Sequence, residues 1–356
     1  MKNVKNVQSV KKKLDYTLKL TLDLLAIPSV SGDCDAALAR VRKEFNDLGL
    51  PCRETNKRAL IATWNGADDS RHRLIAAHID TLGADVRLIK ENGRLRLRPI
   101  GGLDWRSLAG ENGFVRTLEG KEYRGTLMPD HAARHAFPEE VRNEPHTLDT
   151  VEFRLDVRTG SKSETEALGI HCGDLVFFDP RTELTDTGYL KSRFLDDKAG
   201  VALILGAIRQ MKEQGLSPAH TTHFYITNYE EIGHGAPVIP ERTVEFTAID
   251  IGVVAEGTAS SEHAVTILAR DNITHYDRPG ILQLKRLAEE HDIPYRIDGY
   301  QNYGSDASVA LRCGKDLSAL CFGPGAEATH HYERTHLDSL EATLRLLILH
   351  LQTQLL

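Results

Sequence analysis

Five apolar runs, far apart in this chain, each end in side chains that can bind metal ions. An apolar run with a polar end is typical of a buried parallel strand, whose carboxyl end delivers residues to the ligand-binding edge of a sheet. We therefore expect an α/β fold in which the ends of these runs converge. The residues at those ends are His78 and Asp80, Asp196 and Asp197, Glu230 and Glu231, Asp250, and His330 and His331.

Two histidines and several carboxylates at one sheet edge are a suitable ligand set for a pair of divalent metal ions. Such a pair polarises a carbonyl group and generates hydroxide at neutral pH, so the expected reaction is hydrolysis. Two divalent ions, one hydroxide and the three carboxylates of Asp196, Glu231 and Asp250 carry no net charge together. Neutrality favours this set because uncompensated charge is costly in a partly desolvated site.

One long stretch of the chain differs in pattern from the rest. From about residue 83 to residue 187, short segments alternate apolar and polar residues between glycine turns, which predicts a small, barrel-like antiparallel β insert. On both sides of it, helices alternate with strands. We predict an α/β catalytic domain with a mostly parallel sheet at 1–82 and 188–356, interrupted by the insert at 83–187. The expected helices cover 15–27, 197–214, 280–291 and 340–355, and the strands 60–64, 73–77, 221–227, 246–251 and 317–322.

Charge and cysteine content argue against several classes of protein. The chain has 44 basic and 51 acidic residues and no basic stripe, so nucleic acid is not an expected partner. No segment approaches a membrane span, and Lys19 and Asp23 interrupt the first apolar stretch, so no membrane partner and no signal peptide are expected. Five cysteines without CxxC spacing fit reduced thiols. We expect a cytoplasmic protein.

The order and spacing of several motifs resemble the family M42 metallo-aminopeptidases, which are related to glutamyl aminopeptidases and tetrahedral deblocking aminopeptidases. The matching motifs span nearly the whole chain and lie at residues 24–32, 78–80, 99–102, 195–200, 230–233, 248–250 and 304–307. The resemblance implies an aminopeptidase that acts on short peptides. It also implies that the insert drives dimerisation and that dimers form a hollow tetrahedral dodecamer, which would admit peptides and exclude folded proteins.

By this resemblance, Asp196 would bridge two ions, with His78 and Asp250 completing one ligand set and Glu231 and His330 the other. Zinc is the expected metal, although nitrogen and oxygen ligands also accept cobalt and manganese.

Two further carboxylates have expected roles outside the ligand set. Glu230 can lie over the bridging water, where it would act as general base and then return the proton to the leaving amine. Asp80 lies two residues after His78, on the same face of a strand, and is expected to accept the imidazole N–H.

The last ligand segment leaves three histidines open. The family commonly has one histidine followed by Ser-Pro, whereas this chain has His330, His331 and, further on, His336. We expect His330 to be the ligand, because a similar branch of the family reads His-Gly-Tyr-Glu-Arg-Thr-His. His331 is the second choice and His336 the third.

Each of these residues also has a purely structural interpretation. An Asp-Asp pair before a helix is usually an N-cap, and Asp197 fits that role even if Asp196 is a ligand.

The sequence leaves two functions open besides the aminopeptidase. A metal-dependent carboxypeptidase, dipeptidase or deacylase of the M20 type, acting on a small and possibly blocked dipeptide, has a similar ligand order but a different second domain. A non-catalytic protein of the same fold would be expected to lack Glu230 or a ligand, and none is missing.

Overall fold

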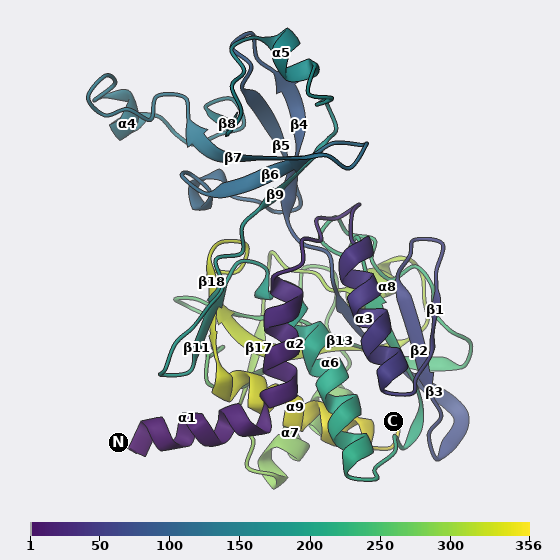
Figure 1. Cartoon of the computed structure of the whole chain (residues 1–356). Coiled ribbons are helices and arrows are strands. Elements are labelled where there is room, and N and C mark those ends of the chain that lie inside the picture. Colours follow the sequence, from purple (N-terminus) through teal and green to yellow (C-terminus); the bar gives the residue numbers. More distant parts are fainter. Residues whose placement is uncertain (1) are drawn as a thin grey trace. The chain divides into compact units, whose positions relative to one another are not determined.

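The computed structural model of the chain describes residues 2–356, with side chains from residue 7 onward (Figure 1). The chain divides into two compact units. The first contains the residues up to Asp80 and Arg181–Leu356, and the second is Thr81–Pro180. Among the described residues, no helix has both the length and the apolar character needed to cross a membrane.

Within residues 2–356, a mixed sheet of twelve strands forms the centre of the first unit. Four neighbouring strands in it run parallel, namely β12 (His220–Thr227), β3 (Asp68–His78), β13 (Thr243–Ile249) and β17 (Ser318–Glu327). Their apolar runs are buried, as expected of parallel strands covered on both faces. The remaining strands are β1 (Cys52–Glu54), β2 (Leu60–Trp64), β10 (Glu183–Leu184), β11 (Tyr189–Ser192), β14 (Gly252–Val254), β15 (Val265–Arg270), β16 (Tyr295–Gly299) and β18 (Glu333–His336).

Helix α6 (Leu195–Glu213) is the central helix of this unit (Figure 1). It is apolar on most of its surface, and it packs against β3, α2 (Asp15–Leu25) and α9 (Leu337–Leu351). Helix α7 (Arg278–Glu290) matches the helix predicted at 280–291. The structure adds α1 (Lys2–Lys13), α3 (Asp35–Asp47) and α8 (Asp306–Arg312), which were not predicted.

The second unit is a closed six-stranded barrel, which confirms the predicted barrel-like β insert. All of its strand pairs are antiparallel, and Leu95, Leu97, Phe153 and Val176 are fully buried. The barrel strands, in chain order, are β4 (Gly83–Ile89), β5 (Leu95–Ile100), β6 (Asn112–Arg116), β7 (Glu122–Pro129), β8 (Val151–Leu155) and β9 (Leu175–Phe178). Its helical pieces are short: η1 (Trp105–Ser107), α4 (Glu140–Asn143) and α5 (Lys162–Glu166).

Candidate metal centre

The carboxyl ends of the parallel strands bring the predicted site residues together within the first unit. Strands β12 and β3 pair in parallel with Thr227 opposite His78, so the residues that follow β12 start level with the end of β3. The same edge continues at β13, whose last residue is Ile249. The candidate residues at this edge are His78, Asp80, Glu230, Glu231 and Asp250, and they are joined by Asp196 from the start of α6 and His330 from the loop between β17 and β18.

The carboxylate of Asp196 faces two different histidines. Its Oδ1 lies 3.0 Å from Nε2 of His78, and its Oδ2 lies 3.7 Å from Nε2 of His330. The same nitrogen of His330 is 3.7 Å from Oε2 of Glu231. Donor atoms of His78, Asp196 and Glu231 all lie within 4.8 Å of one another. The arrangement offers ligand atoms on both sides of one carboxylate.

Asp80 organises this edge in a different way from the one predicted. Nδ1 of His78 is 3.0 Å from the backbone carbonyl oxygen of Asp80 and 3.6 Å from its carboxylate, so the imidazole N–H is directed at the carbonyl. The carboxylate instead accepts the backbone N–H groups of Glu230 and Glu231 at 3.1 and 3.3 Å, and the hydroxyl of Ser31 at 2.5 Å. The prediction assumed strand geometry at Asp80, but β3 ends at His78.

Asp197 has the capping role that its position suggested. Its Oδ1 accepts the backbone N–H of Gly200 at 3.2 Å, and its Oδ2 accepts the backbone N–H of His78 at 3.2 Å. The peptide bond between Asp196 and Asp197 is cis. Atoms of Asp197, His78 and Asp250 also lie within 4.8 Å of one another. Because both oxygens of Asp197 already accept backbone hydrogen bonds, we keep it outside the ligand set.

The ring of His330, the first choice among the three histidines left open by the sequence, contacts Asp196 and Glu231 of the cluster. His330 adopts a left-handed backbone conformation, with φ of 64°, which is uncommon outside glycine and is found more often at functional loops. His336 is directed elsewhere, since its Nε2 lies 2.9 Å from the carbonyl oxygen of Thr187.

Glu333 is a residue of this site that the sequence reasoning missed. One of its oxygens accepts the backbone N–H of Asp196 and the other that of His330, both at 3.1 Å. Its side chain is almost fully buried. The carboxylate thus joins the two loops that carry these candidate ligands. The sequence did carry a signal for it, because Glu333 follows His330 by three residues, where the similar branch of the family also has a glutamate.

The centre holds more negative than positive charge. Burial, followed by the charge of Asp196, raises the pKa of Asp250 to about 7. Burial also raises the pKa values of Glu230 and Glu231 well above the usual range. For Asp196, burial alone would raise the pKa, but the hydrogen bond and charge of His78 outweigh it and lower the value.

These residues fit divalent cations. The cluster combines imidazole nitrogens with carboxylate oxygens, which are the ligands of catalytic zinc sites. Its crowded carboxylates are compensated by only two histidines, so added positive charge would stabilise the ionised forms.

A cavity of about 690 Å³ opens onto this centre. Its wall combines apolar, amide and basic side chains, so it can hold a small polar substrate beside the ligands. The wall residues outside the cluster include Ile232, Asn272, Ile273, Asn302, Tyr303, Val309 and Arg312.

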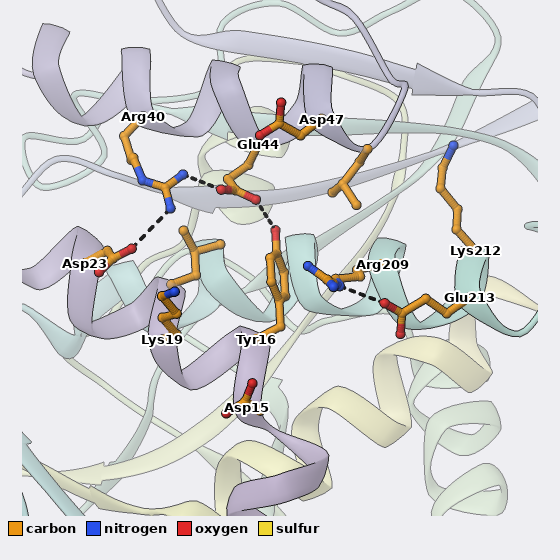
Figure 2. Close-up of a pocket in the computed structure, with 12 residues that line it drawn as sticks. Asp15, Tyr16, Lys19, Asp23, Arg40, Glu44, Asp47, Arg209, Lys212 and Glu213 are labelled. Atoms are coloured by element: carbon orange, nitrogen blue, oxygen red, sulfur yellow. Dashed lines mark hydrogen bonds and ion pairs between the residues drawn. The ribbon is translucent and has the colours of Figure 1, made fainter.

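A second cavity, of about 670 Å³, lies between α2, α3 and α6 and is lined by none of the candidate ligands (Figure 2). Its main charged groups are already paired, because Glu44 accepts hydrogen bonds from Tyr16 and Arg40, and Arg40 also contacts Asp23. Burial and the hydrogen bond to Glu44 raise the pKa of Tyr16, so it stays protonated.

Sequence comparison decides the family. Residues 59–346 match the family described as M42 glutamyl aminopeptidase. The chain belongs to this family. "Putative aminopeptidase YhfE" of Bacillus subtilis (strain 168) is 40% identical to it over 338 residues, which cover 95% of this chain and 97% of that protein. The M42 resemblance found in the sequence is therefore confirmed, and the chain is an aminopeptidase of peptidase family M42.

Solved structures agree with this fold. The TET aminopeptidase of Thaumarchaeota archaeon SCGC AB-539-E09 superposes with a TM-score of 0.84 at 19% identity, covering 95% of this chain and 96% of that one. The TET1 peptidase of Pyrococcus horikoshii superposes with a TM-score of 0.80 at 22% identity, covering 95% and 100%. The latter can assemble into a tetrahedron or a large octahedral shell.

Proposed function

We propose that this M42 aminopeptidase is a dinuclear-metal enzyme that removes N-terminal residues from short peptides. The observation that carries the proposal is the position of Asp196, whose two oxygens face His78 and His330 separately. Asp196 would be shared by two ions, with His78 and Asp250 in one ligand set and Glu231 and His330 in the other. Zinc suits this set best, and cobalt or manganese would also be accepted.

The ions and Glu230 would have different roles in the reaction. Bound divalent ions would polarise the scissile carbonyl and acidify the attacking water. Glu230 takes the proton from that water and returns it to the leaving amine. Its position supports this role, since its Oε2 lies 3.8 Å from Nε2 of His78 and it lines the cavity.

Asp80 acts through its neighbours. Its carbonyl oxygen fixes the ring of His78, and its carboxylate holds the backbone of Glu230 and Glu231. A ligand and the base are thereby oriented by one residue, as is usual for groups that hydrogen-bond to metal ligands.

A substrate panel tests the function directly. The purified protein would be assayed with zinc, cobalt or manganese on aminoacyl-p-nitroanilides, free dipeptides and N-blocked dipeptides. The panel needs both acidic and apolar N-terminal residues, because the cavity wall includes Arg312 as well as Ile232, Ile273 and Val309. We expect metal-dependent release of residues with a free amino group. Hydrolysis of blocked dipeptides alone would favour the dipeptidase or deacylase alternative.

We further propose that the chain forms a homo-oligomer of the tetrahedral type found in the related TET1 peptidase. The barrel would supply the dimer contact, and the assembly would restrict substrates to peptides. Light scattering should give a mass about twelve times the 39.6 kDa of one chain. A monomer at working concentration would contradict this part of the proposal.

The five free cysteines of the described chain fit a reducing compartment such as the cytoplasm.

A further inference from the structure

A second group of metal-binding side chains lies in the first unit and includes none of the residues of the centre described above. It consists of His263, His336 and Asp338, whose donor atoms all lie within 4.8 Å of one another. His263 precedes β15, while His336 ends β18 and caps α9. From the geometry of this group we propose a separate mononuclear site for a divalent transition-metal cation of the zinc type.

The two distances from Asp338 to the histidine nitrogens match those between ligands of one ion. Oδ2 of Asp338 is 3.1 Å from Nδ1 of His263 and 3.1 Å from Nδ1 of His336. With metal–ligand bonds of about 2.0–2.2 Å, neighbouring ligand atoms in a zinc site are separated by roughly 3.0–3.5 Å. The carboxylate oxygen is thus separated from each nitrogen as two ligands of one ion would be.

The tautomer of His336 leaves its Nδ1 without a proton, as a metal ligand requires. Its Nε2 lies 2.9 Å from the carbonyl oxygen of Thr187, and a carbonyl can only accept, so Nε2 carries the proton. Nδ1 therefore has a lone pair directed toward Asp338. A ligating histidine whose other N–H is held by a backbone carbonyl is the usual arrangement at metal sites.

Most contacts around the three side chains favour binding of a cation, and one opposes it. The rings of His263 and His336 are 4.5 Å apart, and Tyr189 packs edge-on against both of them. The nearby guanidinium of Arg334 donates to Glu262 at 2.9 Å, so its charge is balanced. Against binding, Nδ1 of His336 also accepts the backbone N–H of Asp338 at 3.1 Å, and an ion would displace that bond.

Three protein ligands leave room for water on the ion, so the site would exchange with solvent more readily than a four-ligand site. His263 is half exposed, which provides a path for entry. An ion here would tie the segment before β15 to the junction of β18 and α9. We assign it a structural role, since these side chains line neither the cavity at the metal centre nor the cavity between α2, α3 and α6.

Zinc counting tests the site. Chelator-stripped wild type, His263→Ala, Asp338→Asn and the control His291→Ala would be dialysed against the same buffered free zinc, and bound zinc would be counted by mass spectrometry. His291 is exposed and has no part in the group. We expect wild type and His291→Ala to bind one more zinc per chain than the other two variants. Equal zinc content in all four proteins would overturn the proposal and leave only a hydrogen bond between His263 and Asp338.

The temperature of thermal unfolding shows whether the variant is folded. In chelator, wild type and His263→Ala should unfold at nearly the same temperature, because His263 is half exposed. Added zinc should raise the midpoint more for wild type, since an ion that binds only the folded state stabilises it. Equal zinc shifts in both proteins would count against the site. The difference between variants does not depend on how many ions the centre at His78 holds, so this test and that of the proposed function can fail separately.

Discussion

Glu333 accepts a hydrogen bond from the backbone N–H of Asp196 over 3.1 Å. Its second oxygen does the same for His330, so one buried carboxylate fixes the backbone of both residues. Replacing it with an amide puts an N–H donor opposite one of these backbone donors. We predict that Glu333→Gln weakens metal binding by about 10–100-fold, as is usual when a group that orients metal ligands is changed.

Titration with a metal indicator would measure this change. Glu327→Gln is the matched control, because Glu327 ends β17, close in sequence to the same loop, and its side chain is half exposed. Unaltered metal affinity in Glu333→Gln would remove Glu333 from the support of the site.

The histidine pair gives a second prediction. The ring of His330 lies 3.7 Å from both Asp196 and Glu231, so His330→Ala should lower the metal content by one ion per chain. His331→Ala should leave the metal content as in wild type. Metal analysis of both variants, beside wild type prepared identically, decides between them. The reverse result would move the ligand to His331.

The sheet edge could be predicted from the sequence, because apolar runs that end in polar residues identify buried parallel strands without any tertiary information. This is why His78, Glu230 and Asp250 could be grouped together. Helix α3 was not predicted, although Leu38, Val41 and Phe45 follow a helical spacing and are buried against the core. The group of His263, His336 and Asp338 was missed because His263 and His336 are 73 residues apart in sequence and are brought together when β15 and β18 both pair with β17.

Asp80 shows the limit of period-based reasoning. The alternation of side chains between two faces holds only within a strand. Strand β3 ends at His78, so the rule does not apply to Asp80, which lies in the loop that follows. Glu333 was out of reach for a different reason. Its role depends on two backbone N–H groups of other segments, and no pattern of side chains encodes those contacts.

A buried ion pair gives a prediction about acid stability. Arg73 donates to Glu245 at 2.5 Å, and His350 lies 3.1 Å from the same oxygen. Burial would raise the pKa of Glu245, but the charges of Arg73 and His350 lower it from 4.5 to about 2. A lowered folded-state pKa adds stability that is fully present above the unfolded value of about 4.5 and is lost as the pH falls toward 2.

Glu245→Gln should therefore lower the free energy of unfolding by about 3 kcal/mol near pH 7, since it leaves Arg73 buried without its partner. The gap to wild type should narrow as the pH falls below about 4.5. Urea unfolding at several pH values measures it, with the exposed Glu241→Gln as control. A gap that stays constant down to pH 3 would show that ionised Glu245 is not the stabilising species.

The most direct test of the account is Glu230→Gln, measured for both metal content and peptide turnover. If Glu230 transfers protons and is not a ligand, the variant should keep the metal content of wild type while kcat falls by about 10²–10⁴-fold. Glu231→Gln, its neighbour in the ligand set, should lose metal as well as activity. Metal-replete Glu230→Gln with turnover close to wild type would contradict the assignment of the base, and with it the proposed mechanism.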